Sequence, residues 1–350
     1  MKRILIVDDS ALVRKQLREV VEEMGGFEFD TAKNGQEAVS KAVANPYDVI
    51  TMDINMPVMD GLTAVKEIMQ KSPQAILMVS SLTHDQADTT IEALENGAVD
   101  YIGKPGTMNV GLRENKEDLI TKIKALSIIP KRRLKAHPQR RIDNMRAPQK
   151  VDDTKFTSKD ISKIVLIGAS TGGPGLIEKI CSSLPASFPH PVCIVQHMPE
   201  QFTRSFAERI GRASRLNVSE VSDKEEIKPG HIYIAAGGKD LHFGKKVSGT
   251  IVARHDDSSK GRFFMPSVDE MMLSAVKVFG ADKIYAALLT GIGDDGAQGM
   301  VAIKSGGGHT LGENEESCTV YGMPKSAYDA GGVSEQLSFD EILKKIVSFR

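Results

Sequence analysis

The feature that most limits the fold of this chain is the alternation of short apolar runs with segments of helical spacing. Residues 164–167, Ile-Val-Leu-Ile, are one such run without a polar interruption, as expected of a strand buried on both faces. The same alternation recurs in both halves of the chain, and strands joined by helices form parallel sheets. The sequence therefore predicts an α/β protein with two doubly wound, mostly parallel-sheet domains.

A length of 350 residues is comfortable for two domains, and a change in composition indicates where they join. Residues 130–150 contain eight Lys or Arg side chains and one acidic side chain, and Pro130, Pro138 and Pro148 interrupt them. Such a segment is typical of a linker. We predict a first domain at residues 1–126, a basic, proline-containing linker at 127–160 and a second domain at 161–350.

The composition argues against several classes of protein. The formal net charge is −1, so no overall field favours nucleic acid or an anionic membrane. No apolar run is long enough to span a bilayer, and residues 1–9 are expected to open a strand rather than form a signal peptide. Three widely spaced cysteines without a C-x-x-C pattern fit a reducing compartment. We therefore expect a cytoplasmic protein without membrane insertion and without a nucleic-acid partner.

The apolar periodicity places individual elements in each domain. In the first domain it predicts strands at 4–7, 27–31, 49–52, 76–79 and 101–102, with helices at 10–24 and 36–44. In the second it predicts strands at 163–167, 192–196, 231–235, 250–253, 284–289 and 308–311, with a hairpin around 241–253. It predicts helices near 174–183, 203–212, 266–278, 298–305 and 325–330.

Polar residues follow the predicted strands of the first domain, namely Asp8, Asp9, Asp53, Ser80, Ser81 and Lys104. The carboxyl ends of parallel strands share one edge of the sheet, where ligands bind. Three carboxylates at that edge repel one another unless a cation neutralises them, and oxygen ligands beside a lysine favour Mg²⁺. Magnesium with a carboxylate, a hydroxyl and an ammonium group is suited to phosphoryl transfer onto the carboxylate.

Four segments of this domain resemble the receiver domain of two-component response regulators: residues 7–10, 52–61, 79–81 and 103–105. The resemblance implies a flavodoxin-like fold with Asp53 as the phosphoacceptor and a histidine kinase as the phosphodonor. It implies that Mg²⁺ is held by Asp8, Asp9, Asp53 and the carbonyl of Asn55. It further implies that Ser80 and Lys104 bind the phosphoryl group and that Tyr101 is the switching aromatic residue.

In the second domain, residues 168–172 fit the pattern G-x-S-x-G, which can place a serine on a tight strand-to-helix turn. Ser170 would then lie at the carboxyl end of a strand, beside the free N–H groups of the next helix. Ordinary glycine-rich turns match this pattern as well, so a base is needed. His197 directly follows the run at 192–196 and shares that edge of the sheet, whereas His190 precedes the run.

A carboxylate that orients the imidazole is expected in the glycine-rich loop at residues 290–297. Asp294 and Asp295 both lie there, and spacing does not separate them; one would hold the imidazole and the other would cap the following helix. A serine activated by such a pair is a nucleophile with a general base. Backbone N–H groups after Ser170, at Thr171, and in the loop at Ile292 would bind the oxyanion.

Five segments of this domain resemble the effector domain of the CheB family of chemotaxis methylesterases: residues 168–173, 196–199, 262–269, 289–297 and 321–324. The resemblance implies a larger α/β methylesterase domain whose triad is Ser170, His197 and Asp295, without a cofactor at the esterase site. It implies phosphorylation-activated hydrolysis of glutamate γ-methyl esters on methyl-accepting chemoreceptors in chemotactic adaptation, together with deamidation of receptor glutamines.

We hypothesise that the unphosphorylated receiver packs over the edge that carries Ser170, and that phosphorylation shifts this equilibrium. Three alternatives stay open. A DNA-binding regulator would use the basic linker but predicts a helix-turn-helix output. A nucleotide-binding output would use the loop at 168–175, although G-x-G-x-x-G and a P-loop lysine are missing. A scaffold would bind receptors without hydrolysing their esters.

Overall fold

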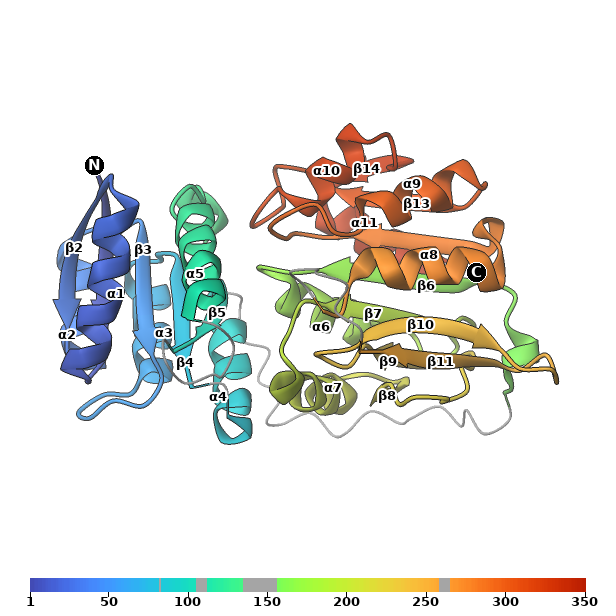
Figure 1. Ribbon diagram of the computed structural model, residues 1–350, viewed down its shortest axis with the longest axis horizontal. Coiled ribbons are helices and arrows are strands. Elements are labelled where there is room, and N and C mark those ends of the chain that lie inside the picture. Colours follow the sequence, from blue (N-terminus) through green and yellow to red (C-terminus); the bar gives the residue numbers. More distant parts are fainter. Residues whose placement is uncertain (82, 105–111, 135–155, 258–264) are drawn as a thin grey trace. The chain divides into compact units, whose positions relative to one another are not determined.

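The computed structural model describes residues 1–81, 83–104, 112–134, 156–257 and 265–350. The chain divides into two compact units, Met1–Arg140 and Arg141–Arg350, because most contacts between residues fall within one unit or the other (Figure 1). This division falls inside the predicted linker, whose residues 135–155 lie outside the described part of the chain. Ile129 and Leu134 near its start and Ser158 near its end are buried. The bounds of the linker stay a prediction.

The first unit is a five-stranded parallel sheet with the strand order β2-β1-β3-β4-β5. Its strands are β1 (Lys2–Val7), β2 (Phe27–Ala32), β3 (Val49–Asp53), β4 (Ile76–Ser80) and β5 (Asp100–Gly103). Its helices are α1 (Ala11–Met24), α2 (Gly35–Ala44), α3 (Gly61–Lys71), α4 (His84–Glu95) and α5 (Leu112–Leu126), followed by the short 3₁₀ helix η1 (Lys131–Arg133). This strand order is that of flavodoxin-like sheets, so the predicted fold is confirmed.

Local signals in the sequence explain how these elements reach the edge of the sheet. Ser10 caps α1 with its side chain, and Gly25 ends that helix with a φ of 62°. Val7 pairs with Met52, so Asp8 and Asp53 lie side by side at the carboxyl ends of β1 and β3. Gly61 begins α3 against the backbone carbonyl of Asp53, where a Cβ would clash.

The second unit contains a seven-stranded sheet with the order β14-β13-β12-β6-β7-β9-β8, in which all neighbouring strands are parallel. Its strands are β6 (Ile164–Ala169), β7 (Val192–Gln196), β8 (Asn217–Glu220), β9 (His231–Ile234), β12 (Ile284–Leu288), β13 (His309–Glu313) and β14 (Glu335–Leu337). Strand β6 is the first strand of this sheet along the chain, and later strands are added on both sides of it. The carboxyl end of β6 is therefore the switch point, the place at which α/β sheets bind ligands.

Helices cover both faces of this sheet (Figure 1). The chain forms α6 (Gly173–Ser183), α7 (Glu200–Ala213), α8 (Val268–Phe279), α9 (Ala297–Ser305), α10 (Met323–Asp329) and α11 (Phe339–Ser348), with the 3₁₀ helices η4 (Ser158–Asp160) and η5 (Ala281–Lys283). Helix α6 packs against α7 and α11, while α9 packs against α8 and α10. No helix in the described ranges is long and apolar enough to cross a membrane.

The predicted hairpin around residues 241–253 is present. It is a separate antiparallel sheet of β10 (Asp240–Lys245) and β11 (Ile251–Asp256), which includes the strand expected at 250–253 and packs on α8 through Phe243 and Phe279. Other elements of this unit were missed. Strands β8 and β14 were not predicted, because they are short edge strands with mixed polar side chains. Helix α11 was not predicted either, although Ser338 and Glu341 form a capping box at its start.

Candidate active site and phosphoacceptor pocket

Ser170 lies directly after β6, on the turn that leads into α6. Its backbone N–H donates to the carbonyl of Thr290 (3.0 Å), and its own carbonyl accepts from Gly173 N–H (2.8 Å). Gly172 has a φ of 80°, a left-handed conformation that the turn requires and that glycine adopts without strain. The side chain of the loop residue Ser170 is thereby held at the switch point, and the residue is 7% exposed.

His197 lies directly after β7, the neighbour of β6. Ala169 pairs with Gln196 in parallel register, so residues 170 and 197 follow adjacent strands at the same edge. The backbone N–H of His197 donates to the carbonyl of Ala169 (3.1 Å). Gln196 adds a further link, because its amide nitrogen donates to the carbonyl of Ser170 (2.9 Å). Sequence reasoning gave Gln196 no role, although a polar residue that ends an apolar strand was a usable signal.

Asp295 reaches this edge from the loop after β12. Its Oδ2 lies 2.8 Å from Nε2 of His197 and accepts from Val268 N–H (2.7 Å). Its Oδ1 accepts from the Ser267 hydroxyl (2.8 Å) and from Asp269 N–H (3.0 Å). Burial raises the pKa of Asp295, but the hydrogen bond and charge of His197 and the backbone donors outweigh it and leave the pKa below its ordinary value. The aspartate is therefore a stable carboxylate that holds the imidazole.

Because Asp295 holds the imidazole, the sequence prediction assigns Asp294 to cap the following helix, α9. The side chain of Asp294 does not cap this helix. It is exposed, and α9 starts after Gly296 with a φ of 93° and without a side-chain cap at that position. The backbone carbonyl of Asp294 accepts from Ala297 N–H (3.1 Å). The prediction was wrong because the N-terminus of α9 receives its acceptor from another helix: Gly299 N–H donates to Asp269 (2.7 Å).

The two segments that contain the predicted oxyanion donors, Thr171 and Ile292, pass beside Ser170. Thr171 is buried, and the loop before Ile292 passes so close that a Cβ on Gly291 would lie 2.8 Å from the Cβ of Ser170. Thr290 fixes both segments: its hydroxyl donates to the carbonyl of Thr171 (2.9 Å). The use of the N–H groups of Thr171 and Ile292 for an oxyanion stays a prediction.

Glu313 supports the turn that contains Ser170, and it was not found from the sequence. It ends β13, is fully buried, and accepts from Thr290 N–H (2.9 Å) and from the Ser317 hydroxyl (2.9 Å). The carbonyl of Thr290 in turn accepts from Ser170 N–H, so the buried carboxylate acts on the turn through the backbone of Thr290. The usable signal was its position at the same strand edge as Ser170.

His190 lies at the opposite edge, before β7, as its position in the sequence indicates. It is buried against Phe188 and Phe349, with ring centroids at 5.7 and 5.0 Å. Burial lowers its pKa to about 4, with contributions from Lys163 and Arg350. It is therefore a packed, neutral histidine remote from the carboxyl edge.

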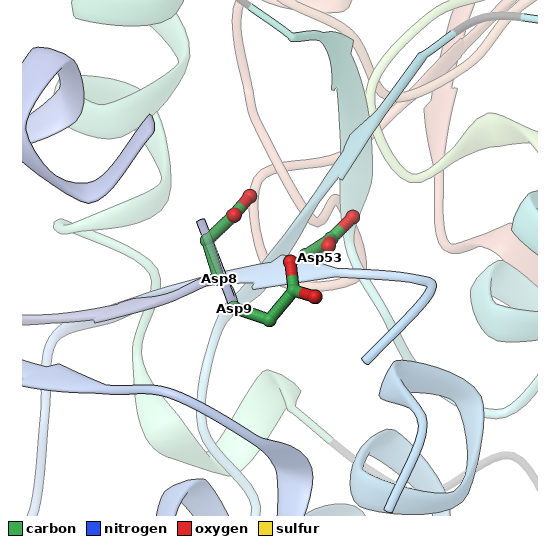
Figure 2. Close-up of side chains that lie close together, drawn as sticks. All are labelled: Asp8, Asp9 and Asp53. Atoms are coloured by element: carbon green, nitrogen blue, oxygen red, sulfur yellow. The ribbon is translucent and has the colours of Figure 1, made fainter. Parts of the chain in front are cut away.

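A second site lies at the carboxyl edge of the first unit. Asp8 and Asp53 are buried, Asp9 is exposed, and one oxygen from each lies within 4.8 Å of the others (Figure 2). Lys104 Nζ lies 2.9 Å from Asp53 Oδ1 and 3.0 Å from Asp8 Oδ2. Burial raises the pKa of Asp53, the charge of Asp8 adds to this, and Lys104 opposes it.

This acidic pocket fits a divalent cation. Asp53 Oδ2 is buried and has no hydrogen-bond partner within the described part of the chain, so one carboxylate oxygen is open to a ligand. One lysine faces two buried carboxylates, which leaves the pocket with excess negative charge. Oxygen donors of this kind suit Mg²⁺. The ligand set proposed from the sequence would add the carbonyl of Asn55, whose side chain is exposed.

The remaining predicted residues of this unit, Ser80 and Tyr101, are both buried. Ser80 is buried at the end of β4, and its hydroxyl donates to Gln86 (2.9 Å), which also accepts from Ser81 N–H. Sequence reasoning did not single out Gln86. Tyr101 is buried in β5 with the Lys122 ammonium 5.2 Å from its ring centroid, and burial raises its pKa well above the ordinary value. Pro105, part of the receiver motif, lies outside the described residues.

Each of the two units matches a different family of known proteins. The family model for CheB methylesterase matches residues 165–346, and that for the response regulator receiver domain matches residues 4–114. The chain belongs to the CheB methylesterase family. A relative from Carboxydothermus hydrogenoformans, named protein-glutamate methylesterase/protein-glutamine glutaminase 2, is 46% identical, with 99% of this chain and 98% of the relative covered.

Other members of the family are also similar over their whole length. The Archaeoglobus fulgidus protein-glutamate methylesterase/protein-glutamine glutaminase is 41% identical, with 99% of this chain and 97% of that protein covered. The crystal structure of the Thermotoga maritima CheB methylesterase catalytic domain is 39% identical, with a TM-score of 0.52, and covers 54% of this chain and 99% of that domain. The family membership predicted from the motifs is confirmed.

Proposed function

We propose that this chain is a phosphorylation-activated serine esterase that hydrolyses glutamate γ-methyl esters on chemoreceptors and deamidates receptor glutamines. The observation that carries the proposal is the 2.8 Å contact between His197 Nε2 and Asp295 Oδ2, at the strand edge that also carries Ser170. The names of the full-length relatives, which include both activities, support the same substrates. The receiver model at residues 4–114 supports control by phosphorylation.

In the proposed reaction, Asp295 holds Nε2–H of His197, so Nδ1 takes the proton of the Ser170 hydroxyl. The Ser170 oxygen attacks the γ-carbonyl carbon, and backbone N–H groups at Thr171 and Ile292 stabilise the oxyanion. The bond to the methoxy oxygen then breaks, and methanol leaves with the proton from the imidazole. Water repeats the sequence on the acyl-enzyme, which restores Ser170 and releases the receptor carboxylate. A glutamine side chain reacts in the same way and releases ammonia.

The proposed switch is the pocket around Asp53. Asp53 accepts a phosphoryl group from the pathway's histidine kinase and becomes an acyl phosphate. When it is bound by Asp8, Asp9, Asp53 and the Asn55 carbonyl, Mg²⁺ supplies positive charge that offsets the repulsion between carboxylates and phosphate. The Lys104 ammonium, already within 3.0 Å of two carboxylates, pairs with the phosphoryl group together with the Ser80 hydroxyl.

The test is methanol release from methylated chemoreceptor by the full-length chain, with and without a small-molecule phosphodonor and Mg²⁺. Wild-type protein is expected to release methanol faster with the donor. Ser170→Ala is expected to reduce release to background while receptor binding survives, which separates the esterase from a scaffold. Asp53→Asn is expected to keep the basal rate and lose the response to the donor. Wild-type protein without methanol release, or Ser170→Ala with a normal rate, would contradict the proposal.

A further inference from the structure

Helices α8 and α9 pack against each other (Figure 1), and the N–H groups at the start of each helix are bound by a carboxylate from the other helix or from its leading loop. Asp295, in the loop before α9, accepts from Val268 N–H (2.7 Å) and Asp269 N–H (3.0 Å), the first two N–H groups of α8. Asp269, in the first turn of α8, accepts from Gly299 N–H (2.7 Å) in the first turn of α9. Asp269 on α8 therefore caps α9, and Asp295 in the loop that leads into α9 caps α8.

From this exchange we infer that Asp269 is a positioning residue of the esterase, an inference that rests on the proposed function. Its task is to fix the loop that carries Asp295, through the N-terminus of α9. Asp295 touches the imidazole directly, whereas Asp269 acts on the reaction through Asp295.

The loop requires an external support of this kind. Gly293 and Gly296 have φ values of 91° and 93°, and glycine has more conformational freedom than any other residue. Helix α9 begins without a side-chain cap from its own N-cap residue. Unpaired N–H groups at a helix start need an acceptor. Asp269 supplies one from α8, which is the helix against which Asp295 must be aligned.

The α8 side of the same junction is fixed by a second buried carboxylate. Asp240 is fully buried and accepts from Ser267 N–H (2.8 Å). The Ser267 hydroxyl donates to Asp295 Oδ1 (2.8 Å). Asp295 is thus held through Ser267, the N-cap residue of α8, and α9, the helix that follows its loop, is held from α8 through Asp269. Removal of the Asp269 acceptor leaves the carboxylate bonded to α8 but frees the loop that delivers it.

Asp269 is a partly buried carboxylate close to a second one, Asp295. Burial raises its pKa to about 6, the N–H groups of Gly299 and Gly296 oppose this, and the charge of Asp295 adds to it. Two neighbouring carboxylates at neutral pH are tolerated because each lies at a helix N-terminus, where the helix dipole stabilises negative charge.

The experiment compares Asp269→Ala and Asp269→Asn with wild-type full-length protein in the methanol-release assay. Asp269→Ala is expected to lower kcat roughly ten- to a hundredfold, because a small misplacement of a positioned group has effects of this size. KM is expected to change little, since Asp269 acts through Asp295. Asp269→Asn keeps an oxygen acceptor for Gly299 N–H and is expected to restore most of kcat.

Ser338→Ala is the matched control. It removes a capping box from α11 in the same domain and should lower the melting temperature without lowering kcat. A second readout does not depend on turnover: the downfield proton resonance of the His197 Nε2–H that bonds Asp295. Asp269→Ala is expected to shift or broaden this resonance, and Ser338→Ala is expected to leave it unchanged.

Three results would overturn the inference: a wild-type kcat and an unshifted resonance in Asp269→Ala, an Asp269→Asn variant as slow as Asp269→Ala, or an equal loss of kcat in Ser338→Ala. Failure of the proposed function is distinguishable from all three. If the proposed function is wrong, wild-type protein releases no methanol. The His197 Nε2–H resonance then still tests whether Asp269 positions Asp295, because it does not depend on turnover.

Discussion

Asp295→Asn tests the geometry of the site most directly, because it changes charge and hydrogen bonding without changing shape. The carboxylate receives four donors on two oxygens: the Ser267 hydroxyl and Asp269 N–H on Oδ1, and Val268 N–H and His197 Nε2 on Oδ2. An asparagine has one oxygen, so an NH₂ group must face one of these two pairs.

Either orientation of the amide leaves one backbone N–H without an acceptor. If the NH₂ group replaces Oδ2, it faces Val268 N–H, and His197 must present a lone pair at Nε2 and carry its proton on Nδ1. If it replaces Oδ1, the Ser267 hydroxyl can turn, but Asp269 N–H loses its partner. An unsatisfied buried donor costs about 1–3 kcal/mol, so we expect the free energy of unfolding to fall by that amount.

The effect on catalysis is larger than the effect on stability. The first orientation places the proton on the nitrogen that must accept the Ser170 proton, and the second keeps the tautomer but removes the charge that stabilises the imidazolium. In a serine protease the same change lowers kcat about 10⁴-fold, so we expect a fall of roughly 10²- to 10⁴-fold here.

The assays are methanol release for kcat, thermal unfolding for stability, and the imidazole N–H proton resonance for the tautomer. Asp294→Asn is the matched control, because Asp294 is the adjacent aspartate and its side chain is exposed. We expect that variant to retain the wild-type rate. The reasoning is refuted if Asp295→Asn keeps kcat within about threefold of wild type, or if Asp294→Asn is the variant that loses activity.

Three further predictions concern stability and pH. Burial raises the pKa of Asp53, so Asp53→Asn should raise the unfolding midpoint of the receiver in metal-free buffer at neutral pH; a lower midpoint would mean that the Lys104 ion pair outweighs burial. Gly172→Ala should cost roughly 1–2 kcal/mol from the left-handed backbone alone, and the new Cβ would lie 2.6 Å from Thr319, so an unchanged melting temperature would contradict the observed turn. The pKa of Asp269 is raised from 3.8 to about 6. Because the folded state then binds more protons than the unfolded state between these values, Asp269 makes stability fall as pH rises through this window. Denaturant unfolding at several pH values should show a weaker fall in Asp269→Asn, and parallel curves would disprove the shift.

The sequence by itself determined the two α/β units and the edge at which each site lies. Apolar runs mark buried strands, and the residue after a parallel strand must lie at its carboxyl end, so Asp8, Asp53, Ser170 and His197 could be assigned to their edges. These inferences are local: they depend on strand periodicity, on glycines that permit tight turns, and on nearby caps. The same local rules failed for β8 and β14, because short edge strands contain few buried apolar residues.

The tertiary structure decided which groups meet at those edges. Residue spacing did not distinguish Asp294 from Asp295, because the choice depends on donors that α8 and β7 deliver from distant parts of the chain. Asp269 and Glu313 were not found for the same reason, since each satisfies a backbone N–H of another element. A buried carboxylate must find its donors wherever the packing places them, and only the folded chain specifies those positions.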